Sequence, residues 1–281
     1  MRTIAIHWGK GNHAQDIISR GIFDGFHVQI VEVGDEIPVR GIDAHMIFLP
    51  IWETQWRILE LLEQWKTIIN FSGIQGTTPI VEHTSQGVSN IHFLFGPGMQ
   101  GELKASLASA WWDEVILGVL QNIEKVGIHI LEHSREEHDQ KVAITQGLAH
   151  ALFLALSEMH LLPSVLFERW KNVPATTSGG MIGLNPFVKK SIEAFIESVK
   201  ISQSVRISLQ RIVWEGEVDD FVTPNFERIF KAILWTNGPE TNMDTSLLNG
   251  RWEELIDHLF TIISLDQKEL QKLIANTRNG N

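Results

Sequence analysis

One histidine lies inside an apolar segment that ends in a Gly-Pro pair. Residues 90–97 read Asn-Ile-His-Phe-Leu-Phe-Gly-Pro, so His92 lies within an expected buried strand that stops at Gly96. A strand interior holds its side chains rigidly, and a turn at a strand end commonly borders a ligand site. These residues alone leave two interpretations open: a core histidine with a satisfied hydrogen bond, or a histidine fixed beside a bound ligand.

A glycine-rich turn lies much earlier in the chain. Residues 3–8 form an expected apolar strand, and Gly9, Gly11 and Ala14 follow in a G-x-G-x-x-A spacing that opens an expected helix. In a dinucleotide-binding unit the first glycine permits the tight turn and the second lets the backbone approach the pyrophosphate. The third position must be small so that the helix packs on the strand, and alanine satisfies this. The alternative is a purely structural turn.

An acidic residue closes the next expected strand, residues 27–32. Glu32 lies about where a dinucleotide-binding unit places the acid that takes the ribose 2′-hydroxyl. A carboxylate there favours NAD over a cofactor with a 2′-phosphate. The order of strand, glycine turn, helix, strand and acid therefore predicts an NAD site.

Strands and helices alternate through the first half of the chain. Further strands are expected at 44–49, 67–71, 90–95 and 127–131, with helices at 53–66 and 111–125. This alternation predicts an α/β Rossmann-type domain with a mostly parallel sheet and helices on both faces. Ligands of such sheets bind at the carboxyl ends of the strands. His92 is expected three residues before the end of its strand, near that edge.

The second half of the chain has a helical pattern. Ser134 and Glu137 form an S-x-x-E capping box, and the helix that starts there continues to about Leu162, apolar almost all round from Leu148. Further helices are expected at 164–172, 186–213, 219–234, 251–263 and 266–275. We therefore expect a Rossmann-type domain at 1–133 and an all-α domain at 134–281. The apolar first helix predicts a homodimer.

A second histidine, His138, lies in the first turn of the capped helix. It is either a surface residue near the cap or a residue whose ring points back toward a ligand between the domains. The chain contains no H-E-x-x-H spacing, and we expect no metal site.

The overall composition excludes several classes of function. The net charge is -11 and no Lys/Arg-rich segment occurs, which argues against nucleic acid as a partner. No apolar segment approaches the length of a membrane span, and no secretory signal is recognisable, so we expect a cytoplasmic protein without a membrane partner.

Together these motifs resemble the prephenate dehydrogenase family, which includes arogenate dehydrogenases. The resemblance covers most of residues 3–160 and is carried by the glycine turn, the Leu-Pro-Ile strand end at 49–51, residues 92–97 and residues 137–150. It implies NAD-dependent oxidative decarboxylation of prephenate or a close analogue, in tyrosine biosynthesis, with His92 as the proton acceptor. It also implies substrate contacts from His138, Ser72 and Gln146, and cofactor contacts from Gly9, Gly11, Ala14, Glu32 and Pro50.

The sequence departs from the family at three places. The family serine that partners the catalytic histidine aligns with Gly73, and Ser72 is one position away. Phe48 stands two residues before Pro50, where the family has a small residue. Residues 176–184 contain no arginine to hold a substrate carboxylate, and Arg169 is the nearest in sequence. Two alternatives therefore stay open: a dehydrogenase of the same architecture with another substrate, and a non-catalytic NAD-binding or regulatory dimer.

Overall fold

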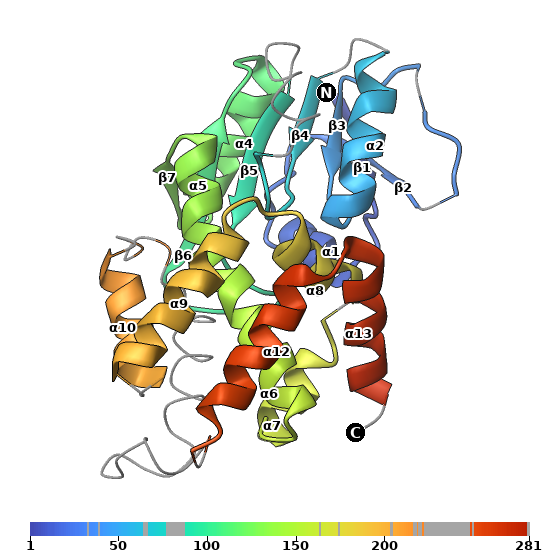
Figure 1. Cartoon of the computed structure of the whole chain (residues 1–281). Helices are drawn as coiled ribbons and strands as arrows, with labels where there is room; N and C mark the ends of the chain where they lie inside the picture. Colours follow the sequence, from blue (N-terminus) through green and yellow to red (C-terminus); the bar gives the residue numbers. More distant parts are fainter. Residues whose placement is uncertain are drawn as a thin grey trace. The chain divides into compact units, whose positions relative to one another are not determined.

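The chain forms two compact units in the computed structural model, Met1–His138 and Asp139–Asn281 (Figure 1). The structure describes all residues except 33, 39, 64–66, 77–87, 163, 174, 203–204, 216–217, 219–220, 222–247, 249 and 280–281. The helix expected at 219–234 lies outside the described residues, apart from Phe221.

The first unit is built on a seven-stranded sheet (Figure 1). Its strands are β1 (Thr3–His7), β2 (His27–Val31), β3 (Ala44–Ile47), β4 (Thr67–Asn70), β5 (Val88–Phe93), β6 (Leu103–Ser109) and β7 (Ile128–Glu132). They lie in the order β2-β1-β3-β4-β5-β6-β7, and every neighbouring pair is parallel except β5 and β6. The predicted α/β class with a mostly parallel sheet is confirmed. β5 ends at Phe93, so His92 is its penultimate residue and lies nearer the strand end than expected.

The antiparallel strand β6 is the one strand that the sequence did not predict. Its residues, Leu-Lys-Ala-Ser-Leu-Ala-Ser, alternate only weakly, and lysine, alanine and serine are poor strand formers. Hydrogen-bonded pairing with a strand on each side stabilises β6 despite this weak local preference. Ser106, for example, lies opposite His92 of β5 and opposite Leu131 of β7. The strand therefore forms through tertiary context.

Helices cover both faces of this sheet. They are α1 (Asn12–Ser19), α2 (Ile51–Leu62) and α4 (Glu114–Lys125). One core cluster joins Ile17 of α1 and Ile116 of α4 to strand residues that include Ile91 and Phe93. A second cluster packs α2 on the opposite face of the sheet. Because side chains alternate along a strand, His92 points to the face that carries α2.

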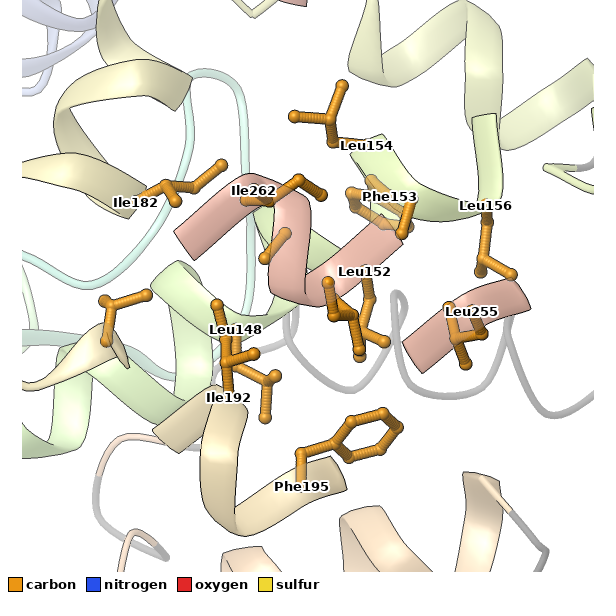
Figure 2. Close-up of a cluster of buried hydrophobic side chains, with 14 of the residues drawn as sticks. Leu148, Leu152, Phe153, Leu154, Leu156, Ile182, Ile192, Phe195, Leu255 and Ile262 are labelled. Atoms are coloured by element: carbon orange, nitrogen blue, oxygen red, sulfur yellow. The ribbon is translucent and has the colours of Figure 1, made fainter. Parts of the chain in front are cut away.

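The second unit is helical throughout its described residues. Its elements are the end of α5 (Arg135–Val142), the π-helix η2 (Ala143–Leu148), α6 (Ala149–Glu158), α7 (Ser164–Trp170), α8 (Ala175–Gly183), α9 (Val188–Ser202), α10 (Val205–Glu215), α12 (Trp252–Ser264) and α13 (Gln267–Asn279). Figure 2 shows the core around α6, where Leu152 and Phe153 lie among Phe195 of α9 and Leu255 of α12. The all-round apolar pattern thus corresponds to a helix buried within its own unit.

The capped helix begins as predicted but does not continue unbroken. The Glu137 carboxylate accepts the Ser134 N–H at 2.7 Å, and the Ser134 hydroxyl accepts the Glu137 N–H at 3.1 Å, which confirms the capping box. The prediction of one uninterrupted α-helix to Leu162 is wrong. The π-helix η2 interrupts the α-helical geometry after α5, and α6 ends at Glu158. Gly147 lies where α9 approaches: a Cβ there would be 2.2 Å from Val188 Cγ2.

Helix α8 is a second element that the sequence did not predict. Its sequence, Ala-Thr-Thr-Ser-Gly-Gly-Met-Ile-Gly, is poor in helix formers. Packing explains the helix, because Gly179 and Gly183 allow α13 to come close. A Cβ at Gly179 would lie 3.0 Å from Gln271 Cγ, and one at Gly183 would lie 2.3 Å from Gln267 Oε1.

Candidate active site

The carboxyl ends of β1, β3, β4 and β5 lie side by side along one edge of the sheet. The strand register pairs His7 with Ile47, Ile47 with Asn70, and Asn70 with Asn90. The chain leaves β1 for β2 on one side and returns to β3 on the other, which makes this edge a topological switch point. Such a point is where α/β sheets bind ligands. The segments after these strands carry most of the predicted site residues.

The glycine turn follows β1 at this edge, and its shape requires small residues. A Cβ at Gly9 would lie 2.5 Å from Ile30 Cδ1, and one at Gly11 would lie 3.2 Å from the Trp8 carbonyl oxygen. Ala14 is in the first turn of α1 and is buried, at 1% exposure. Gly11 is the N-cap of α1 and no side chain caps this helix. The first backbone N–H groups of α1 are therefore open to an anion, as a pyrophosphate site needs.

Glu32 is tied to this turn. It follows β2 directly, and its Oε1 accepts the backbone N–H of Lys10 at 2.9 Å. The Glu32 N–H in turn donates to the Asp35 carboxylate at 2.8 Å. A carboxylate has about four lone-pair sites, so Glu32 can hold the turn and still accept ribose hydroxyls. These residues fit a dinucleotide cofactor.

Pro50 and Phe48 follow β3. Pro50 is the N-cap residue of α2, and the Thr54 hydroxyl fixes this corner by donating to the Leu49 carbonyl at 2.8 Å. The Phe48 ring stacks on Phe71 with centroids 4.5 Å apart, and Phe71 stacks on Phe93 at 5.4 Å. The bulky residue at position 48 is therefore part of an aromatic row across the ends of β3, β4 and β5.

His92 and His138 meet in the first unit. The His92 Nδ1 lies 3.0 Å from the His138 Nε2, and the rings meet edge to face with centroids 5.1 Å apart. His92 is 7% exposed and His138 is 0% exposed. The interpretation of His138 as a surface residue near the cap is therefore wrong. The capping box explains its position, because His138 lies in the first turn of α5 and its N–H donates to the Ser134 carbonyl at 2.9 Å.

Burial determines the charge state of His92. Desolvation lowers the pKa of His92 well below its usual value, and the nearby His138 and His13 lower it further. Near neutral pH the imidazole is therefore uncharged and can accept a proton. One ring nitrogen of the pair must donate and the other accept. When the proton is on His92 Nδ1, that N–H donates a hydrogen bond to His138 Nε2. The lone pair of His92 Nε2 is then available for a substrate proton.

The remaining predicted substrate residues are Ser72 and Gln146. The Ser72 hydroxyl donates to the Ile74 carbonyl and its N–H donates to the Asn70 side chain, both at 3.0 Å. Ser72 therefore stabilises its own loop. Gln146 belongs to η2 in the second unit and is partly buried. The side chain of Arg169 is outside what the structure describes.

Two buried polar pairs near this edge were missed by sequence reasoning. Asn70 and Asn90 share a 2.8 Å hydrogen bond between neighbouring strands, on the sheet face to which His92 points. His7 Nε2 lies 2.9 Å from His45 Nδ1, and desolvation, His45 and Arg57 together lower the pKa of His7 to about 3. Polar residues at the same face of adjacent strands were the available signal.

No protein-family model and no curated protein sequence matches the chain. Among solved structures it is similar to arogenate dehydrogenase from Synechocystis, at 13% identity over 99% of this chain and 92% of that one, with a TM-score of 0.42. It is also similar to prephenate dehydrogenase from A. aeolicus, in complex with hydroxyphenyl propionate and NAD⁺, at 16% identity over 93% and 96%, with a TM-score of 0.42. D-mandelate dehydrogenase with NADH matches at 11% identity over 99% and 98%, with a TM-score of 0.45.

Within the described residues, no group of three or more His, Asp or Glu side chains could hold a metal ion. No helix among them combines the length and apolar character needed to cross a membrane.

Proposed function

We propose that this protein is an NAD-dependent dehydrogenase in which His92 accepts the hydroxyl proton of the substrate. The observation that carries the proposal is the buried pair of His92 on β5 and His138 on α5, whose ring nitrogens lie 3.0 Å apart. The edge on which this strand ends also carries a glycine turn that requires small residues and an acid bound to that turn. A neutral, fixed imidazole on a sheet that can hold a dinucleotide suits alcohol oxidation.

The cofactor would be held by the edge after β1 and β2. The uncapped N-terminus of α1 and the glycines of the turn suit its pyrophosphate, and Glu32 suits a ribose hydroxyl, which favours NAD. Pro50 at the end of β3 is a further proposed contact. When bound, NAD supplies a nicotinamide ring that accepts a hydride.

The residues of the chain would handle the proton. As the substrate carbinol loses its hydride, its hydroxyl proton passes to His92 Nε2 and a carbonyl forms. His92 is then an imidazolium, and its Nδ1–H remains hydrogen-bonded to His138 Nε2. That bond stabilises the charge and keeps the ring oriented, as the partner of a catalytic histidine does in other enzymes. We propose that His138 takes the role of the family serine that aligns with Gly73, as the partner of His92.

For the substrate, we propose prephenate or a close analogue, from the resemblance of the motifs around Gly9, His92 and His138 to that family. Such a substrate is a cyclohexadienol with a ring carboxylate, and loss of carbon dioxide after the oxidation makes its ring aromatic. A different substrate is the second candidate. It is favoured by α8, which occupies residues 175–183 without an arginine.

The homodimer remains a proposal, and its surface must be reconsidered. The apolar helix that suggested it is α6, whose residues Leu152 to Leu156 are buried within the chain itself. A dimer interface would therefore use other surfaces of the chain. The mass from sedimentation at several protein concentrations tests this, and a concentration-independent monomer would exclude the dimer.

Two measurements separate the candidate functions. NAD binding is measured by calorimetry on the wild-type chain, and turnover is measured as NADH formation with prephenate and with arogenate. Turnover that is lost in His92→Asn, with the fold intact by circular dichroism, supports the proposal. NAD binding without turnover of either compound points to another substrate. Hydride transfer that survives in His92→Asn would exclude His92 as the proton acceptor.

A further inference from the structure

An arginine near the end of the last helix has no acidic partner among the residues that the structure describes. In α13 the guanidinium of Arg278 donates to the Val173 carbonyl and, at 2.9 Å, to the Ser178 hydroxyl. Its Cζ lies 4.4 Å from the centre of the Trp170 ring. Burial lowers the pKa of Arg278 to about 10, and among the described residues no carboxylate contributes to that shift. Within the described part of the second unit, this partly desolvated positive charge thus has no compensating anion.

Two further donors in the same cluster also lack an acceptor. The Arg278 Nε and the Trp170 Nε1 are both buried, and neither has a hydrogen-bond partner within the described residues. Most buried donors in proteins are paired, and leaving one unpaired costs about 1–3 kcal/mol. Two unpaired donors beside one unpaired charge call for an acceptor that carries negative charge.

Neighbouring side chains contribute a directed hydroxyl. Ser178 on α8 accepts from Arg278, so its own proton is directed to His150 Nδ1 on α6, 3.1 Å away. Burial, and then the nearby Arg278, lower the pKa of His150 to about 4. His150 is therefore a neutral acceptor near pH 7 and does not offset the charge.

The site is held in place by helix packing. Gly183 lies against Gln267 and Gly179 lies against Gln271, so α8 and α13 run antiparallel in close contact. This register brings Arg278 to Ser178 near the start of α8. The end of α7 supplies Trp170. Helices α7, α8 and α13 thus meet at the guanidinium, as expected for a built site rather than an incidental surface arginine.

We propose that Arg278, Trp170 and Ser178 form a binding site for a small carboxylate in the helical unit. A planar carboxylate matches the fork geometry of a guanidinium, and the indole N–H adds a donor. This inference is independent of the proposed dehydrogenase activity, because all its residues lie in the second unit.

The matched comparison is Arg251, an arginine of the same unit that already has an acid. It forms a bidentate pair with Glu254, 2.6 Å from Nε to the carboxylate, and this hydrogen bond raises the pKa of Arg251. Arg278→Gln and Arg251→Gln remove the same charge, but only the first removes the proposed site.

The test is thermal unfolding of the full chain in sodium acetate, with sodium chloride at equal ionic strength as the reference. A ligand that binds the native state raises the unfolding temperature as its concentration rises. We expect an acetate-specific rise in the wild type and in Arg251→Gln, and none in Arg278→Gln. Calorimetric titration of the wild type with acetate gives a second readout if Arg278→Gln does not fold.

Three outcomes would overturn the proposal. One is an equal effect of acetate and chloride on the wild type, and another is an acetate effect that survives in Arg278→Gln. The third is a rise in unfolding temperature with inorganic phosphate but none with acetate. That result would mean that the site binds a tetrahedral anion and not a carboxylate.

Discussion

His92 Nδ1 and His138 Nε2 lie 3.0 Å apart, with their rings edge to face. One histidine comes from the end of β5 and the other from the first turn of α5. Two rigid elements therefore fix the relative orientation of the rings. A hydrogen bond between two buried imidazoles requires at least one neutral ring, and burial keeps His92 neutral because it lowers its pKa. The pair can thus take up one proton as a unit.

Replacing His92 tests its role directly. In His92→Asn the amide keeps a polar side chain in the strand but cannot accept a proton near neutral pH. We expect kcat to fall by roughly 10²–10⁴-fold, the usual contribution of a general base, with little change in the NAD dissociation constant. Steady-state kinetics and calorimetric titration with NAD measure the two quantities. Unchanged kcat in a folded variant would contradict the role.

Replacing His138 separates positioning from simple structural support. His138→Gln can still accept a hydrogen bond from His92 but cannot share the proton, so we expect kcat to fall less than in His92→Asn. The pH–kcat profile should also move, because His138 lowers the pKa of His92 and its removal raises that pKa. If the midpoint of the pH–kcat profile stays the same in His138→Gln while the free energy of unfolding falls, His138 only supports the fold.

Much of the first unit could be predicted because its local signals agree with its tertiary structure. The glycine turn, the acid after β2 and the capping box at Ser134 each act over a few residues. Elements determined by distant packing were missed. β6 depends on pairing at both edges, and α8 is a glycine-rich helix held by α13. The contact between His92 and His138 spans separate elements, and no short-range pattern encodes it.

Glu32 is expected to determine cofactor affinity and selectivity. In Glu32→Gln the side chain keeps its length, but the charged acceptor for Lys10 N–H and for ribose hydroxyls is lost. Hydrogen bonds to charged groups are worth about 1.5–3 kcal/mol, so we expect NAD to bind roughly 10–100-fold more weakly. Calorimetric titration with NAD and NADP measures this change. Asp35→Asn is the control, since the Asp35 carboxylate accepts the Glu32 backbone N–H and so supports the loop. An equal loss of NAD affinity in Asp35→Asn would assign the effect to the structure of that loop.

Gly147 is expected to tolerate no side chain. A Cβ would lie 2.2 Å from Val188 Cγ2 and 3.3 Å from the Met181 carbonyl oxygen, so Gly147→Ala must displace α9 or η2. Overpacking of this kind costs about 1–3 kcal/mol, which here exceeds the gain that alanine gives in a helix. Urea denaturation measures the loss. In Gly147→Ala/Val188→Ala the clash is removed, and stability should recover in part; a double variant no better than the single one would assign the loss to η2 itself.

The buried His7–His45 pair is expected to make stability depend on pH. His7 is 1% exposed, and desolvation, followed by His45 and Arg57, lowers its pKa to about 3 from the value of 6.5 that it has when unfolded. Between these values the unfolded chain binds a proton that the folded chain excludes. The contribution of His7 is therefore complete above about pH 6.5 and is lost as the pH falls, by up to about 1.4 kcal/mol per pH unit.

Removing that histidine should flatten this dependence. His7→Gln keeps a hydrogen-bonding side chain beside His45 but does not titrate. The free energy of unfolding, measured in urea between about pH 7 and about pH 5, should fall less steeply than in the wild type by up to about 1.4 kcal/mol per pH unit. His129→Gln is the matched control, because it also removes one histidine but from an exposed position on β7. Equal slopes in the wild type and in His7→Gln would mean that the pair takes up a proton without unfolding.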